Sequence, residues 1–218
     1  MRFIPALLLG AGLLASSAFA SPTAPKDGAE YRTLPAPQAT QAAPGKVEVV
    51  EFFMYHCPAC YMLEPTIKEW AAKNADKVTF RRIHLPLTGP NDPEAHLFLT
   101  LDAMKLEDSL HDKVLHTWHV QRKQLRSDED NLDWAVKNGI DKAKFTSVYN
   151  SFGVVTRLRG LGKVAAAYTV NSTPTLIVNG RYLTSPELIG KSNPGVTNAN
   201  AGMATMQVLD ALVAMSRK

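Results

Sequence analysis

The most continuous run of apolar positions in the chain extends over Val47–Tyr55 and is rich in β-branched and aromatic residues. Such a run predicts a central strand that is covered on both of its faces. A helix is expected to follow over Cys57–Asn74, with Pro65 as a kink. A second strand is predicted over Val78–His84. This order of strand, helix and strand indicates a parallel βαβ unit.

The next block of the chain changes to a helical spacing of apolar positions and has no strand signal. After a loop over Leu85–Pro93, we predict helices over Pro93–Leu106, Ser109–Lys123, Asp128–Asn138, Lys142–Phe152 and Val154–Tyr168. The acidic start of the third helix and the glycine that follows it are typical helix boundaries. We therefore interpret residues 86–170 as an all-helical insertion in an α/β domain.

The last part of the chain returns to strand patterns and closes with a helix. Thr175–Val178 is a short apolar run, and Asn179-Gly180 between it and Arg181–Thr184 is a strong hairpin signal. Residues 185–201 are rich in Pro, Gly and Asn, which predicts a loop. The final helix is expected over Met203–Ser216.

The first twenty residues have the pattern of a signal peptide. Arg2 is followed by a mostly apolar stretch over Phe3–Ala15 and by the cleavage pattern Ala18-Phe19-Ala20, so cleavage is expected to leave Ser21 at the N-terminus. The alternative is an uncleaved anchor helix, although the apolar stretch is short for a membrane span. No later apolar run is long enough to cross a bilayer. We therefore expect a soluble, exported protein in a compartment where disulfides persist.

Five segments follow from these patterns. After the signal peptide over 1–20, a Pro-rich leader over 21–45 is expected to contain an edge strand near Tyr31–Leu34. The α/β domain then has a first part over 46–85 and a second part over 171–218, one on each side of the helical insertion.

The amino-acid composition excludes several classes of function. The chain has 218 residues, a formal net charge of +4 and no long run of Lys or Arg, so we do not expect nucleic-acid binding. Two cysteines are too few for a multi-disulfide scaffold or a four-cysteine zinc site. Both lie in Cys57-Pro58-Ala59-Cys60, at the predicted junction of a strand and a helix. This setting indicates a redox-active pair.

The spacing of the two cysteines gives their thiols different surroundings. With Cys57 at the helix N-cap and Pro58 at the first helical position, the backbone N–H groups of Ala59 and Cys60 point towards the Cys57 sulfur and stabilise its thiolate. The helix dipole adds about 0.3–2 kcal/mol. We expect Cys57 to be exposed and to form the mixed disulfide. Cys60 lies one turn inward and is expected to be the resolving thiol.

Two other interpretations of the pair stay open. A static disulfide would close a very small loop and add little stability. A metal site would need His56 or His84 and further ligands that no pattern identifies. We therefore expect thiol chemistry with no metal and no cofactor.

Two glutamates in the central strand are expected to differ. Glu51 lies six positions before Cys57 within an apolar run, so burial should raise its pKa. It is a candidate proton acceptor for the Cys60 thiol, and the alternative is an edge or surface glutamate. Glu48, close to the start of the strand, is expected to be solvated.

Further candidates lie on both sides of the insertion. Thr173-Pro174 precedes a predicted strand, so the proline marks a strand start or a turn, and a cis bond is plausible there. His56 would favour a thiolate if protonated and would be a bystander if neutral. The other polar and aromatic candidates are expected to be structural or solvated, namely His84, His96, His111, His116, His119, Trp70, Trp118, Trp134, Arg157, Arg159 and Lys163.

These residues together carry a family resemblance. The run Glu51-Phe-Phe-Met-Tyr-His-Cys-Pro-Ala-Cys-Tyr61, the later Thr173-Pro174 and the helical block between them resemble the DsbA family of periplasmic thiol:disulfide interchange proteins. The resemblance implies a thioredoxin-like fold with an inserted all-helical domain. It also implies that Cys57 is the nucleophile, Cys60 its buried partner and Glu51 the buried acid, and that Thr173-Pro174 is a cis-proline loop that pairs with substrate peptides.

The resemblance implies partners and a compartment as well. We expect the protein to act in the periplasm, to oxidise reduced exported proteins, and to be reoxidised by a quinone-linked membrane protein of the DsbB type. One position departs from the family pattern, because Ala59 stands where a histidine is common. The absence of that histidine predicts a less oxidising couple unless His56 compensates.

Three functions are therefore compared. We expect an oxidase that donates the Cys57–Cys60 disulfide. A reductase or isomerase is the first alternative, although isomerases usually carry a separate dimerisation domain and the leader is short; we expect a monomer. A metal or peptide carrier that uses the cysteines as ligands is the second.

Overall fold

The computed structural model describes residues 21–217, so the predicted signal peptide lies outside the described residues. In the described part of the chain, a five-stranded sheet has the order β1-β5-β4-β2-β3. Its strands are β1 (Arg32–Thr33), β2 (Val47–Phe53), β3 (Val78–His84), β4 (Thr175–Val178) and β5 (Tyr182–Thr184). The edge strand β1 is therefore shorter than the predicted 31–34.

Strand β2 lies inside the sheet and all seven of its residues are buried, as its continuous apolar pattern predicts. It pairs in parallel with β3 and antiparallel with β4. The strand ends at Phe53, two residues before the predicted end, because the chain turns there and the Cys57 N–H donates to the Met54 carbonyl at 3.1 Å. This turn directs Cys57 towards the end of the sheet.

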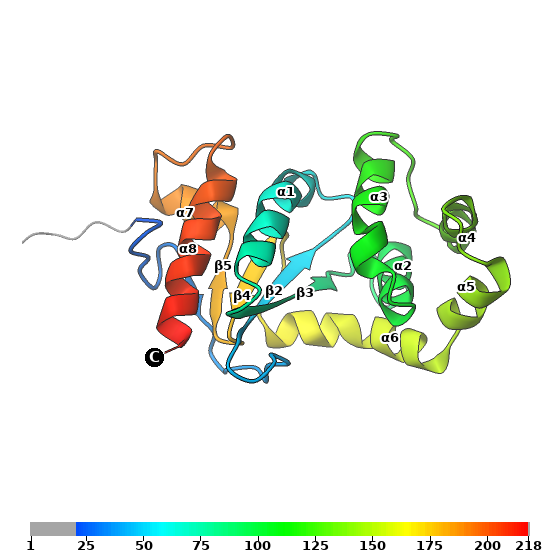
Figure 1. Cartoon of the computed structure of the whole chain (residues 1–218), viewed down its shortest axis with the longest axis horizontal. Helices are drawn as coiled ribbons and strands as arrows, with labels where there is room; N and C mark the ends of the chain where they lie inside the picture. Colours follow the sequence, from blue (N-terminus) through cyan, green and yellow to red (C-terminus); the bar gives the residue numbers. More distant parts are fainter. Residues whose placement is uncertain (1–20, 218) are drawn as a thin grey trace, which may run out of the picture.

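Two layers of helices cover the sheet (Figure 1). Helices α1 (Pro58–Lys73) and α8 (Ala201–Ser216) pack together on one face, where their apolar residues join Val49 and Val178 in one cluster. The opposite face, which includes Val50 and Ile177, packs against the inserted helices. The sheet core is therefore closed on both sides.

The predicted helical block is confirmed between β3 and β4. It consists of α2 (Pro93–Ala103), α3 (Glu107–His119), α4 (Asp128–Lys137), α5 (Lys142–Tyr149) and α6 (Phe152–Ala167), which form the right-hand part of the molecule in Figure 1. Their buried residues belong to the same hydrophobic cluster as the β2 residues Val50 and Phe52. The insertion therefore shares its core with the sheet, and Trp70, Trp118 and Trp134 are buried as expected.

The prediction of a continuous loop over 185–201 was wrong. Helix α7 (Pro186–Ser192) begins there because the Ser185 hydroxyl accepts a hydrogen bond from the Leu188 N–H at 3.0 Å, with Pro186 at the first helical position. Ile189 is the buried residue of this short helix.

The predicted hairpin turn is confirmed, and the leader crosses it. Asn179 and Gly180 have φ values of 52° and 61°, as a tight hairpin requires. A Cβ at Gly180 would lie 2.2 Å from the Gln38 carbonyl oxygen, so the leader also requires a glycine there.

The prediction that Glu48 is solvated was wrong. Its side chain is fully buried, with Oε1 2.9 Å from Arg81 Nε. The Gln41 N–H of the leader donates to the same oxygen at 2.7 Å. Arg81 on the neighbouring strand and the backbone of the leader thus take the place of water around the Glu48 carboxyl group.

Among residues 21–217, the helices are all too short or too polar to span a bilayer.

Candidate active site

Cys57 is the N-cap of helix α1. Its sulfur accepts a hydrogen bond from the Cys60 N–H at 3.4 Å, and Pro58 occupies the first turn. Both cysteines are free thiols. Cys57 is the more accessible of the two, but at 7% against 2% for Cys60 it is buried, so the expectation of an exposed sulfur was wrong. The loop that contains Thr173 covers it.

The two thiols have opposite acidities. Hydrogen bonding from the Cys60 thiol, helped by the backbone N–H groups of the first helical turn, lowers the pKa of Cys57 to about 5 despite its burial. The same hydrogen bond, together with burial and the charge of Cys57, raises the pKa of Cys60 far above its ordinary value. At neutral pH, this arrangement holds one nucleophilic thiolate beside one protonated thiol.

Glu51 lies beneath this pair and is 1% exposed, which excludes the alternative of a surface glutamate. Burial raises the pKa of its carboxyl to about 7, while the nearby Arg82 guanidinium opposes that rise. Glu51 Oε2 lies 3.3 Å from Arg82 Nε. The charge of Glu51 also contributes to the raised pKa of Cys60, so the carboxyl and the buried thiol influence each other.

The Thr173-Pro174 segment faces the N-terminus of α1. The peptide bond between the two residues is cis, and the Thr173 carbonyl oxygen lies 3.5 Å from Cys57 Sγ. Pro174 is buried directly before β4. Residues 116 positions apart in the sequence thus meet at the sulfur.

His56 precedes Cys57 and is held by Glu94 of helix α2. The ring Nδ1 lies 2.8 Å from Glu94 Oε1, and the His56 backbone N–H donates to Oε2 at 3.1 Å. The hydrogen bond to Glu94, which outweighs the effect of burial, raises the pKa of His56. Because the charge of Cys57 acts in the same direction, a protonated His56 and a Cys57 thiolate favour each other.

Comparison with known proteins agrees with this geometry. Residues 48–196 match the DSBA-like thioredoxin domain. The chain is 35% identical to the thiol:disulfide interchange protein DsbA of Burkholderia cepacia over 212 residues, which covers 97% of this chain and 95% of that protein. It is 39% identical over 184 residues to DsbA of Azotobacter vinelandii, covering 81% and 86%. The chain belongs to the DsbA family.

Solved structures give the same result for the fold. The crystal structure of Pseudomonas aeruginosa DsbA matches with a TM-score of 0.74 at 36% identity and covers 87% of this chain and 93% of that one. The thioredoxin-like fold with inserted helices is confirmed. As a member of the DsbA family, the protein is a thiol:disulfide oxidoreductase.

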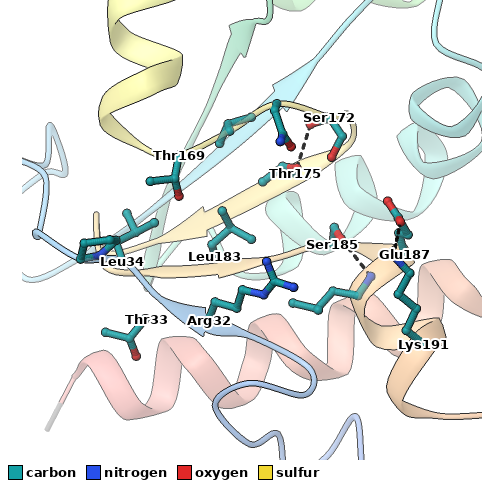
Figure 2. Close-up of a pocket in the computed structure, with 14 residues that line it drawn as sticks. Arg32, Thr33, Leu34, Thr169, Ser172, Thr175, Leu183, Ser185, Glu187 and Lys191 are labelled. Atoms are coloured by element: carbon teal, nitrogen blue, oxygen red, sulfur yellow. Dashed lines mark hydrogen bonds and ion pairs between the residues drawn. The ribbon is translucent and has the colours of Figure 1, made fainter.

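A pocket adjoins the loop that contains Thr173 and Pro174, on the face of the sheet opposite α1 and α8. It has a volume of about 440 Å³ and is lined by the loop residues Asn171 and Ser172, by Arg32 of β1, and by Glu187 and Lys191 of α7 (Figure 2). Glu187 and Lys191 form an ion pair at 2.5 Å. The surface beside Thr173 is therefore polar and charged on this side.

Sequence reasoning missed several charged neighbours of the DsbA-type site. Glu94 carried no signal beyond its position in the first turn of a helix. Arg82 and His111 are separated from Glu51 by whole elements in the sequence, and nothing in their spacing points to the cysteines.

Within residues 21–217, no group of three or more His, Cys, Asp or Glu side chains is arranged to hold a metal ion.

Proposed function

We propose that the protein is a dithiol oxidase whose Cys57–Cys60 disulfide is transferred to reduced proteins. The observation that carries this proposal is the position of Cys57 as the N-cap of α1, with its sulfur 3.4 Å from the Cys60 backbone nitrogen. This geometry lowers the pKa of Cys57 and raises that of Cys60. A stabilised Cys57 thiolate favours the reduced form of the pair, which makes the disulfide a better oxidant.

In the proposed reaction, a substrate thiolate attacks Cys57 Sγ of the disulfide. The bond between the two cysteines breaks, Cys60 leaves as a thiolate and takes up a proton, and a mixed disulfide forms at Cys57. A second substrate thiolate then attacks the substrate sulfur of the mixed disulfide. The substrate leaves oxidised by two electrons, and the enzyme keeps a Cys57 thiolate and a Cys60 thiol.

The supporting residues have distinct proposed roles. Glu51 exchanges the proton of Cys60, which its burial next to the pair supports. Thr173 and Pro174 form the loop on which a substrate backbone pairs, as in the family. Pro58 starts the helix, and Ala59 lies between the cysteines without adding charge. In its protonated form, His56 supplies the positive charge that a histidine at position 59 supplies in the common family pattern.

The partners and the compartment are part of the proposal. Reduced exported proteins are the substrates, and a membrane protein of the DsbB type restores the disulfide, as the family membership of the chain suggests. The site of action is the periplasm after cleavage of residues 1–20. We also propose that the mature protein is a monomer. We propose that its chain divides into a leader over 21–45, an α/β domain over 46–85 and 171–218, and a helical insertion over 86–170.

The experiment that tests the oxidase role uses a Cys60→Ser variant. In this variant Cys57 is first converted to a mixed disulfide with glutathione, and a reduced exported protein with a single cysteine is then added. The protein thiolate should attack Cys57 Sγ and release glutathione as a thiolate, and the resulting adduct should accumulate until a thiol reductant releases it, because neither Cys60 nor a second substrate thiol is present to resolve it. Cys57→Ser is the matched control and should form none. Equal trapping by the two variants would overturn the assignment of Cys57 as the nucleophile. Stoichiometric zinc or copper bound by both thiols would favour the carrier alternative instead.

A further inference from the structure

Five ionisable side chains gather beneath the cysteine pair, and the proposed reaction uses only one of them, Glu51. The other four are Glu64 of α1, Arg82 of β3, and Glu107 and His111 of α3. Their side chains are between 3% and 15% exposed. Three carboxyl groups thus share this interior with a single permanent cation.

Arg82 brings two of the carboxyl groups together. Its Nε lies 3.3 Å from Glu51 Oε2, and its Nη2 lies 2.7 Å from Glu64 Oε1. Nε and Nη2 occupy one edge of the planar guanidinium, so both carboxyl groups approach the same edge. The charge of Glu64 also contributes to the raised pKa of Glu51, after the larger effects of burial and of Arg82.

His111 continues this chain of contacts outwards. Its Nε2 lies 3.4 Å from Glu64 Oε2, and its Nδ1 lies 3.0 Å from Glu107 Oε1. The ring also packs against Phe53, at 5.0 Å between ring centroids. The two ring nitrogens of His111 thus face two different carboxyl groups, so the ring lies between Glu64 on the inner side and Glu107 on the outer side.

A cavity connects His111 with the surface between α1 and α3, which lie side by side (Figure 1). It has a volume of about 240 Å³ and is lined by Glu64 and His111 inside and by Lys68, Asp108 and Asp112 at its rim. Lys68 and Asp112 are more than half exposed. Among the described residues, this cavity shares no lining residue with the pocket beside the Thr173 loop.

We propose that His111 is a positioning residue through which Glu51 exchanges its proton with solvent, on the opposite side of the pair from the bound substrate. The inference rests on the proposed role of Glu51 and extends it. A polypeptide joined to Cys57 covers the Thr173 side of the site, so a proton that moves there would have to pass the substrate. The cavity between α1 and α3 stays open while the substrate is attached.

The proton balance is complete in each direction. When a thiolate attacks the Cys57–Cys60 disulfide, the Cys60 thiolate takes the proton of Glu51, and His111 returns a proton from water by way of Glu64. When the pair is reoxidised, the Cys60 thiol gives its proton to Glu51 and attacks Cys57 of the mixed disulfide. The partner then leaves as a thiolate, and the proton passes to Glu64, His111 and water. The transfer between Glu51 and Glu64 follows the guanidinium edge of Arg82 that both carboxyl groups contact.

Several charged groups surround His111 and set its proton affinity. Glu64 and Lys68 face it from α1, Arg82 and His84 from β3, Glu51 and Tyr55 from β2 and the turn after it, and Glu107, Asp108 and Asp112 from its own helix. Burial lowers its pKa, but hydrogen bonds to Glu107 and Glu64 outweigh that effect, so the pKa of His111 is raised. The two neighbouring carboxyl groups thus favour the protonated ring of His111.

The test follows the Cys60 step alone. The mixed disulfide of Cys57 with glutathione is formed first, and its resolution by Cys60 is recorded by stopped flow between pH 5 and 9. We expect His111→Gln to slow resolution about tenfold or more, since positioned proton transfer is worth about 10²–10⁴-fold, and to change the pH profile. His116→Gln, on the exposed side of the same helix, is the matched control and should behave like the parent protein.

A second variant separates chemistry from folding. His111→Gly opens space beside the cavity, and added imidazole should restore much of the lost rate. Resolution at the parent rate in both variants, with an unchanged pH profile, would overturn the role of His111. A slow His111→Gly variant that imidazole does not rescue would also overturn it, because the loss would then be structural. Failure of Cys57 to form the mixed disulfide at all would refute the proposed function instead.

Discussion

Replacing Glu51 by Gln should stabilise the folded protein at alkaline pH. The carboxyl is 1% exposed, and burial raises its pKa to about 7 from an ordinary 4.5. A carboxyl group whose pKa is raised by folding is favoured in its protonated form. It therefore costs nothing below pH 4.5, and its cost grows between pH 4.5 and 7 and is complete above that range. The difference in pKa corresponds to about 3 kcal/mol.

Glutamine has the size of the protonated carboxyl and does not ionise. Glu51→Gln should therefore match the parent protein at pH 4 and exceed it by about 3 kcal/mol at pH 8, or by roughly 6–12 °C in melting temperature for a chain of this size. Denaturant unfolding of the oxidised protein at both pH values measures this difference. The oxidised form is chosen because the titration of Cys57 then makes no contribution.

The control for this prediction lies on the same strand. Glu48 is equally buried, but its carboxylate is paired with Arg81 at 2.9 Å. Glu48→Gln should lose stability at pH 8, because the half-buried Arg81 guanidinium is left without its carboxylate partner. A Glu51→Gln variant that is less stable than the parent at pH 8, or a gain that is equal at pH 4 and pH 8, would refute this account of Glu51.

Three further predictions concern the thiolate and its neighbours. The reduced protein should show a thiolate absorbance that titrates near pH 5 and is missing in Cys57→Ser; a midpoint above pH 8 would contradict the geometry. Glu94→Gln should lower the pKa of His56, because the ring loses the carboxylate 2.8 Å from Nδ1, and an NMR titration that finds no change would argue against this pairing. Ala59→His should make the reduction potential more positive, whereas an unchanged potential would mean that His56 or the helix N–H groups already dominate.

Local patterns in the sequence were sufficient to predict the elements that carry the cysteines. The continuous apolar run predicts β2, and the Pro after Cys57 predicts the start of α1, because these signals depend on neighbouring residues only. Helix α7 was missed although Ser185 and Pro186 are standard start signals. Its single buried residue, Ile189, gave no apolar periodicity to accompany them.

The surroundings of the two strand glutamates could not be predicted in the same way. Both interrupt an apolar run, and both are buried. Glu48 is neutralised by a partner on the next strand and covered by the leader, whereas Glu51 meets Arg82 and a second carboxyl, Glu64. The partners come from other elements, so only the tertiary fold decides which charged groups each glutamate meets.

The same reason explains the charged residues that sequence reasoning did not connect. Glu94 lies 38 positions after His56, and His111 lies 47 positions after Glu64. Their contacts depend on how the inserted helices dock onto the sheet. The insertion thus supplies side chains to the site in addition to covering a face of the sheet.

The most direct test of the central claim is the reduction potential of the Cys57–Cys60 pair, measured at pH 7 by equilibration with glutathione. A Cys57 pKa of about 5, against about 7 in thioredoxin, favours the reduced form about 50-fold more at this pH. That factor corresponds to about 50 mV. We therefore expect a potential at least about 50 mV more positive than that of thioredoxin, which is about −270 mV. A potential equal to or below that of thioredoxin would contradict the assignment as a dithiol oxidase.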